Sequence, residues 1–176
     1  MSVDFYWRRV PDPVLSELSP RELDGLIPFR FDAEYEPLVE RGLLLSVVNL
    51  DALMSFTLTR GASGRTDEDD CAVYGAAEVR VEGEEDPDYG FVGVEVFVRT
   101  ADAVRAAAES LRDLPYEAWV RGWDTELAAE AAFVGKGNLT WEQDDADRIV
   151  RGLDRLRDFY DEAARAGDAV VSKVIA

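Results

Sequence analysis

Two groups of carboxylates bracket a strand-like stretch between residues 64 and 91, and carboxylate oxygens are the ligands that hard cations such as calcium prefer. The first group is Asp67, Glu68, Asp69 and Asp70, and the second is Glu82, Glu84, Glu85, Asp86 and Asp88. The first group is too contiguous for an EF-hand loop, in which acids alternate with other residues. A hairpin that brought both groups together could hold a cation. A solvated pair of loops is the alternative, because crowded like charges repel and are screened by salt.

The whole chain is strongly acidic, with a formal net charge of −18 from 37 acidic and 19 basic residues. Such a surface repels nucleic-acid backbones and anionic membranes, which basic side chains normally bind. We therefore expect neither as a partner. The negative electrostatic field of the chain favours a basic protein surface as the partner instead. One form of this hypothesis is an antitoxin or immunity-type protein that covers a basic active site as an acidic mimic of nucleic acid.

Histidine is absent from the chain. Its absence excludes Ser-His-Asp and Cys-His nucleophiles, HExxH metalloprotease sites and facial-triad oxygenase sites, which all need an imidazole. No other set of residues forms a coherent catalytic pattern, and no phosphate-binding glycine loop is present. We expect no catalytic residues, no metal site and no cofactor, and we favour a non-enzymatic binding protein.

A cluster of aromatic and basic residues in the C-terminal half supports a competing hypothesis. It comprises Tyr89, Arg99, Trp123, Trp141 and Tyr160. Aromatic side chains beside arginine can line a pocket for a small molecule. The competing protein is a small-molecule binder, or a hydrolase that uses carboxylates or a divalent cation. The structural alternative is that these aromatics pack helices against the sheet.

The segment "WEQDDAD" places four carboxylates at the start of the longest predicted helix: Glu142, Asp144, Asp145 and Asp147. Negative side chains stabilise a helix N-terminus, which accounts for them without a catalytic role. We expect them to be exposed. Lys136, in the turn sequence "GKGN", is given no role.

These residues must be positioned by a sheet and several helices. Residues 3–10, 71–81, 91–98 and the C-terminal "DAVVSKVIA" predict strands, with a loop at 82–90 completing a hairpin. Residues 43–60 predict a largely buried helix, although their Thr and Val content leaves a strand open in part. Helix caps are predicted at Ser19, Asp32, Thr100 and Asp124, and the longest helix at 141–166.

The order of these elements predicts one α+β domain over residues 1–176, with a small, mostly antiparallel sheet that includes both terminal strands. The lone Cys71 can form no internal disulfide, which fits a reducing compartment. No signal-peptide pattern is present, and no apolar stretch approaches the ~20 residues of a membrane span. We expect a cytoplasmic protein.

Several features recur in a pattern that resembles a known family. They are Tyr89 and Gly90, Trp141, Phe159 and Tyr160, then Ala164, Gly167 and Val170, with "SFTLTRG" at 55–61 and "YWRRV" at 6–10. This chain resembles the YfbM-like family of bacterial proteins of unknown function, most clearly over residues 85–176. The resemblance implies an α+β fold and a bacterial cytoplasmic setting, and no activity. Family members commonly carry Trp and His on the helix equivalent to 46–60, where this chain has neither, so a family site built on them is altered here.

Overall fold

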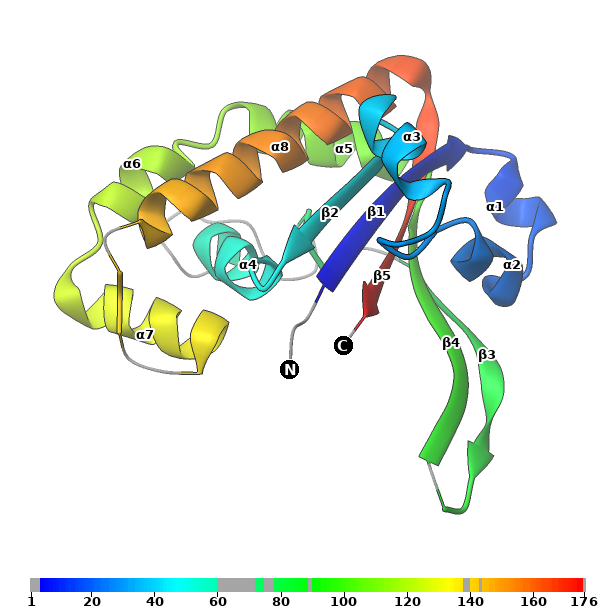
Figure 1. The fold of residues 1–176 in the computed structure, drawn as a ribbon. Coiled ribbons are helices and arrows are strands. Elements are labelled where there is room, and N and C mark those ends of the chain that lie inside the picture. Colours follow the sequence, from blue (N-terminus) through cyan, green and yellow to red (C-terminus); the bar gives the residue numbers. More distant parts are fainter. Residues whose placement is uncertain are drawn as a thin grey trace.

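Five strands form one antiparallel sheet in the order β2-β1-β5-β4-β3 (Figure 1). The strands are β1 (Asp4–Pro11), β2 (Leu44–Val48), β3 (Glu78–Asp86), β4 (Gly90–Arg99) and β5 (Asp168–Ile175). This computed structural model describes residues 4–59, 72–74, 78–88, 90–137, 140–142 and 144–175. The two terminal strands pair along their whole length in the centre of the sheet, as the sequence predicts.

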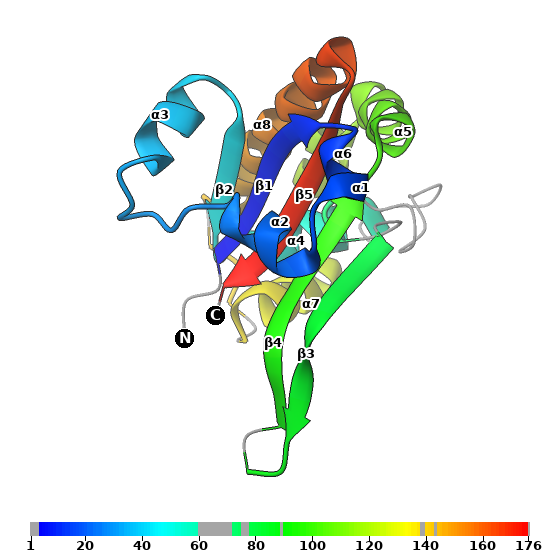
Figure 2. The ribbon, with the colours of Figure 1, turned by 90° about the vertical axis from the view of Figure 1, so that its right-hand side faces the viewer.

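Helices cover both faces of the sheet (Figure 2). One face carries the short helices α1 (Val14–Glu17), α2 (Pro20–Gly25) and α3 (Tyr35–Glu40). The other carries α4 (Asp51–Thr59), α5 (Ala101–Arg112), α6 (Tyr116–Arg121), α7 (Thr125–Lys136) and α8 (Asp145–Ala166). The predicted α+β class with one antiparallel sheet is confirmed.

The central strand β1 supplies side chains to two hydrophobic cores. Successive side chains of a strand point to opposite faces of a sheet. Phe5 and Trp7 therefore enter the core beneath α4, α5 and α8, whereas Tyr6 and Val10 enter the core beneath α1 and α2. Burial on both faces accounts for the run of three aromatic residues, Phe5, Tyr6 and Trp7, in β1.

Local capping chemistry sets the starts of several helices. Ser19 closes a capping box with Glu22, and the side chains of Thr100 and Asp124 accept backbone N–H bonds at the starts of α5 and α7, which confirms three predicted caps. The predicted cap at Asp32 is wrong, because α3 begins at Tyr35 and its N-cap residue is Glu34. The carboxylate of Asp32 instead accepts a hydrogen bond from the backbone N–H of Phe29 at 2.7 Å.

The predicted helix over residues 43–60 is wrong in its first half. Residues Leu44–Val48 form β2, and a helix begins only at Asp51, after Asn49 adopts a positive φ of 51°. Leu44 and Leu45 are buried on opposite faces of the sheet. A strand buried on both faces reads as a continuous apolar run, which periodicity alone does not distinguish from a buried helix.

Candidate functional site

The strands β3 and β4 extend beyond the sheet as a two-stranded ribbon (Figures 1 and 2). They pair with each other from Glu78↔Val98 to Asp86↔Gly90, whereas only residues 97–99 of β4 pair with β5. The loop predicted at 82–90 is therefore wrong, since most of this acidic segment is strand. The valines of β4 opposite it supply the strand signal that Glu82–Asp86 lacks.

Both faces of the ribbon combine carboxylates with valines. Residues directly opposite each other in the register share a face. One face carries Glu82, Glu84 and Asp86 of β3, with Val92 opposite Glu84. The other face carries Val79 and Val81, which are each 50% exposed, and the exposed Glu95 opposite Val81. The ribbon thus presents carboxylates together with accessible apolar side chains.

Contacts with α1 and α2 fix the base of the ribbon. The backbone N–H of Arg21 donates to the carboxylate of Glu82 at 3.1 Å, and the guanidinium of Arg21 lies 3.5 Å from the same group. The guanidinium of Arg80 donates to the backbone carbonyl of Leu15. Glu84, Asp86 and Asp88 lie beyond these contacts. The other predicted bracket, Asp67, Glu68, Asp69 and Asp70, lies outside the described residues, and the side chain of Glu85 is likewise not described.

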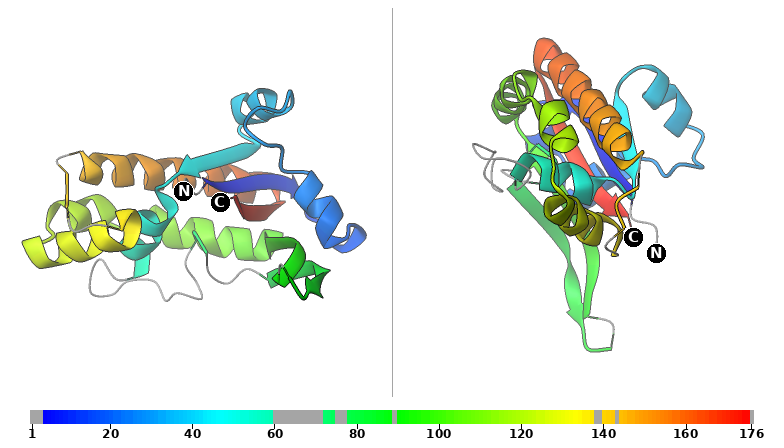
Figure 3. Two further views of the ribbon diagram at one scale, coloured as in Figure 1. Left: turned by 60° about the horizontal axis from the view of Figure 1, so that its bottom comes forward. Right: turned by 90° about the vertical axis from the view of Figure 1, so that its left-hand side faces the viewer.

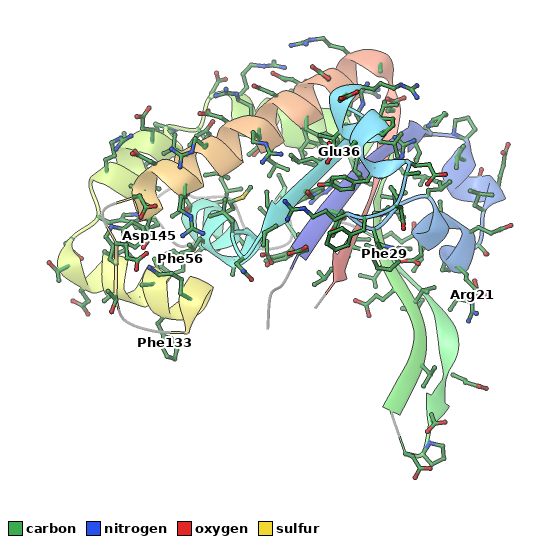
Figure 4. The ribbon with its side chains drawn as sticks, viewed as in Figure 1. Arg21, Phe29, Glu36, Phe56, Phe133 and Asp145 are labelled. Atoms are coloured by element: carbon green, nitrogen blue, oxygen red, sulfur yellow. The ribbon has the colours of Figure 1, made fainter. Side chains whose placement is uncertain are left out.

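Two of the predicted pocket residues do meet at one groove. The rings of Trp123 and Trp141 lie 5.3 Å apart, edge to face, and both line a groove of about 720 Å³ between α6, α7 and the start of α8. Phe56 of α4 packs against Trp123 from the protein interior (Figure 4). Asp124 and Thr125 contribute polar groups at the rim.

The helix α6 forms one wall of this tryptophan groove and is fixed to α8 by a buried phenol. The hydroxyl of Tyr116 donates to the carboxylate of Asp154 at 2.6 Å and accepts from the guanidinium of Arg157 at 2.9 Å. Burial, followed by the bond to Asp154, raises the pKa of Tyr116 well above its ordinary value. The phenol of Tyr116 therefore stays protonated, as a donor, further into the alkaline range than an ordinary tyrosine.

The other predicted pocket residues do not join the tryptophan groove. Tyr160 is fully buried, and its hydroxyl donates to the backbone carbonyl of Ala72 at 3.0 Å. Arg99 is 6% exposed at the end of β4. Neither lines the groove, and for Tyr160 the packing alternative describes the structure. Tyr89 lies outside the described residues.

The expectation that all carboxylates of "WEQDDAD" are exposed is wrong for Asp145, which is fully buried between α7 and α8 (Figure 4). Its carboxylate accepts from the Lys136 ammonium at 2.5 Å, the Arg148 guanidinium at 3.3 Å and the backbone N–H of Glu142 at 2.8 Å. Lys136 therefore has a structural role, contrary to its interpretation as a turn residue. The bond to Glu142 also fixes the segment that carries Trp141.

Glu142, Asp144 and Asp145 place carboxylate oxygens within 4.8 Å of one another, which is the geometry of a candidate metal centre. Lys136 and Arg148 already pair with part of this cluster: the ammonium lies 2.5 Å from Asp145 and 3.8 Å from Glu142, and the guanidinium lies 3.3 Å from Asp145. The arrangement is accounted for as an ion-pair network that joins the end of α7 to the start of α8.

An arginine-lined groove at the edge strand β2 is a feature that sequence reasoning missed. Arg148, Arg151 and Arg155 recur at i, i+3 and i+7, a spacing that places them along one side of α8. Arg30 approaches from the segment between α2 and α3. The spacing was visible in the sequence, but the contribution of Arg30 depends on tertiary structure.

One protein-family model matches most of this chain. A family model described as "Domain of unknown function (DUF1877)" matches residues 15–172. The chain belongs to this family.

One solved structure has a similar fold. YfbM from Escherichia coli, a protein of unknown function, is similar over 98% of this chain and 99% of its own, with a TM-score of 0.56 and 14% sequence identity. At that identity the likeness shows the fold alone. The resemblance to the YfbM-like family is confirmed, and a comparison with curated proteins finds no match. Within the described ranges, no helix of the chain has the length and apolar character needed to cross a membrane.

Proposed function

We propose that this DUF1877 protein is a non-enzymatic module that binds a basic protein through the ribbon formed by β3 and β4. The observation that carries the proposal is the extension of the ribbon beyond the sheet with Glu84, Asp86 and Asp88 past its last contacts with the body of the protein. Clustered charge of one sign accelerates association with a surface of the opposite sign.

The exposed valines distinguish this ribbon from a purely solvating segment. Val79, Val81 and Val92 are each 50% exposed on a two-stranded structure. The strand β3 is also an edge of the sheet, and edge strands offer backbone groups for pairing with another chain. Affinity would then come from apolar contact and strand pairing, and the carboxylates would select a basic partner. An antitoxin or immunity-type protein that covers a basic active site is the specific form that we propose.

The second candidate is small-molecule binding at the tryptophan groove. Its volume of about 720 Å³ falls within the usual range of ligand sites. The paired rings of Trp123 and Trp141 also favour it, because aromatic side chains commonly line such sites. The ribbon is the better candidate, because the groove is open to solvent and the carboxylate among its described lining residues, Asp124, already caps the start of α7.

Neutralising the ribbon tests the leading proposal. The triple variant Glu84→Gln, Asp86→Asn and Asp88→Asn keeps the Glu82 contacts and should lose a basic protein that the wild-type chain captures from cells of its source. We expect at least about a tenfold loss of captured partner, because three steering charges are removed.

A matched control distinguishes the loss of charge at the ribbon from the loss of the same number of charges elsewhere on the protein. The variant Glu109→Gln, Asp113→Asn and Glu126→Gln removes three exposed carboxylates on α5, the residue after it and α7, and it should capture the partner like the wild type. Equal capture by both variants would show that the ribbon is not the binding element.

A further inference from the structure

The arginine-lined groove lies along the free edge of β2. It has a volume of about 470 Å³ and is bounded by α8 on one side and by α3 with its preceding segment on the other. The right-hand view of Figure 3 shows α3 and α8 on either side of β2. Because β2 is an edge strand, alternate backbone N–H groups on its outer side are available to a ligand.

Four arginines line this groove: Arg30, Arg148, Arg151 and Arg155. Arg148 is partly neutralised by Asp145 at 3.3 Å. Throughout the part of the chain that the structure describes, no ion pair joins Arg30, Arg151 or Arg155 to a carboxylate. In a chain with 37 acids and 19 bases, three uncompensated arginines in one groove are a local reversal of charge.

The remaining arginines of α8 show that this reversal is specific to the groove. Arg157 pairs with Asp154 and Asp158, and Arg165 lies 3.9 Å from Asp161. The helix therefore surrounds its arginines with carboxylates away from the groove. No carboxylate is among the described residues that line the groove itself.

The walls and floor of the groove are firmly positioned. The hydroxyls of Tyr35 and Ser46 share a hydrogen bond of 2.6 Å that joins α3 to β2. Gly152 is buried between the arginines, and a Cβ there would lie 2.7 Å from Leu50 and 2.9 Å from Met54. This glycine lets α8 lie close to the connection between β2 and α4, so the arginines of α8 converge on the edge of the strand.

We propose that the arginine-lined groove binds a small ligand that carries two or more negative charges on phosphate oxygens. The planar fork of a guanidinium matches two phosphate oxygens at once, and several such groups around one cavity suit a diphosphate better than a single carboxylate. The volume is that of a small-molecule site. The proposal is independent of the ribbon, which lies at the opposite edge of the sheet.

Calorimetric titration at constant ionic strength tests this site with inorganic pyrophosphate as the probe and citrate as a polycarboxylate of comparable charge. The wild-type protein should bind one pyrophosphate per chain and bind citrate more weakly. The variant Arg151→Gln, Arg155→Gln should bind pyrophosphate at least about tenfold more weakly, a factor that corresponds to about 1.4 kcal/mol.

The matched control is Arg105→Gln, Arg165→Gln, which removes two exposed arginines of 52% and 74% side-chain exposure outside the groove. It should bind pyrophosphate like the wild type. Three results would overturn the proposal: no binding of pyrophosphate to the wild type, equal weakening in both variants, or equal affinity for citrate. Thermal melts of all three proteins verify that each remains folded.

Discussion

Replacement of Asp145 by alanine is expected to lower the free energy of unfolding by about 3 kcal/mol, because removing one partner of a buried ion pair leaves the other charge uncompensated. The Lys136 ammonium, the Arg148 guanidinium and the backbone N–H of Glu142 all lose an acceptor. The side chains of Lys136 and Arg148 are 17% and 35% exposed, so water replaces part of the interaction and the loss stays at the lower end of the range for buried pairs. Urea unfolding followed by tryptophan fluorescence measures it.

Asp144 provides the control for this prediction. It is exposed, and its side chain makes no capping bond to α8, so Asp144→Ala should change the free energy of unfolding by no more than about 0.5 kcal/mol. Equal losses in the two variants would mean that general electrostatics at the helix N-terminus, rather than the buried network, holds this end of α8.

Substitution of Gly135 by alanine is expected to destabilise the protein by about 1–2 kcal/mol. Gly135 lies in α7 against α4, and an added Cβ would overlap Cγ of the fully buried Leu53 and lie 2.6 Å from its Cδ2. Overpacking of this kind typically costs about 1–3 kcal/mol. The higher helix propensity of alanine returns up to about 1 kcal/mol, which leaves a net loss.

A double-mutant cycle isolates this steric contact. Leu53→Ala alone should cost about 2–5 kcal/mol through the cavity that it creates. In that background, Gly135→Ala should become neutral or stabilising, because the clash is gone and the propensity gain remains. The same loss in both backgrounds would contradict the close approach of α7 and α4.

The sequence predicted the fold better than it predicted the residues that meet in space. Strong local signals were sufficient for β1, for the capping box at Ser19 and for the long helix α8. Burial on both faces concealed β2, since its apolar run has no alternation to mark a strand. The acidic half of β3 was also concealed, because its strand character comes from the valines of β4 opposite it.

The sequence indicates the kinds of residue in the candidate sites, but which of them meet in space depends on tertiary structure. The acidic residues of the ribbon stand out in the sequence, which predicts a loop for them rather than a strand. Two of the predicted pocket residues, Trp123 and Trp141, have rings that lie 5.3 Å apart, whereas Tyr160 is directed into the core and its hydroxyl donates to the backbone carbonyl of Ala72. The burial of Asp145 depends on Lys136 from the preceding helix, and no local pattern marks one carboxylate of four as the buried one.

Site-specific photo-crosslinking tests the central claim, binding of a basic protein by the ribbon, most directly. A photoreactive residue would replace Val81 on the ribbon or, as the control, Val134 on α7; the two valines have similar exposure, 50% and 48%. Irradiation in cells of the source should give a discrete adduct with a basic protein at position 81 and none at position 134, and the adduct should fade as salt rises. No adduct at position 81, or the same adducts at both positions, would contradict the claim.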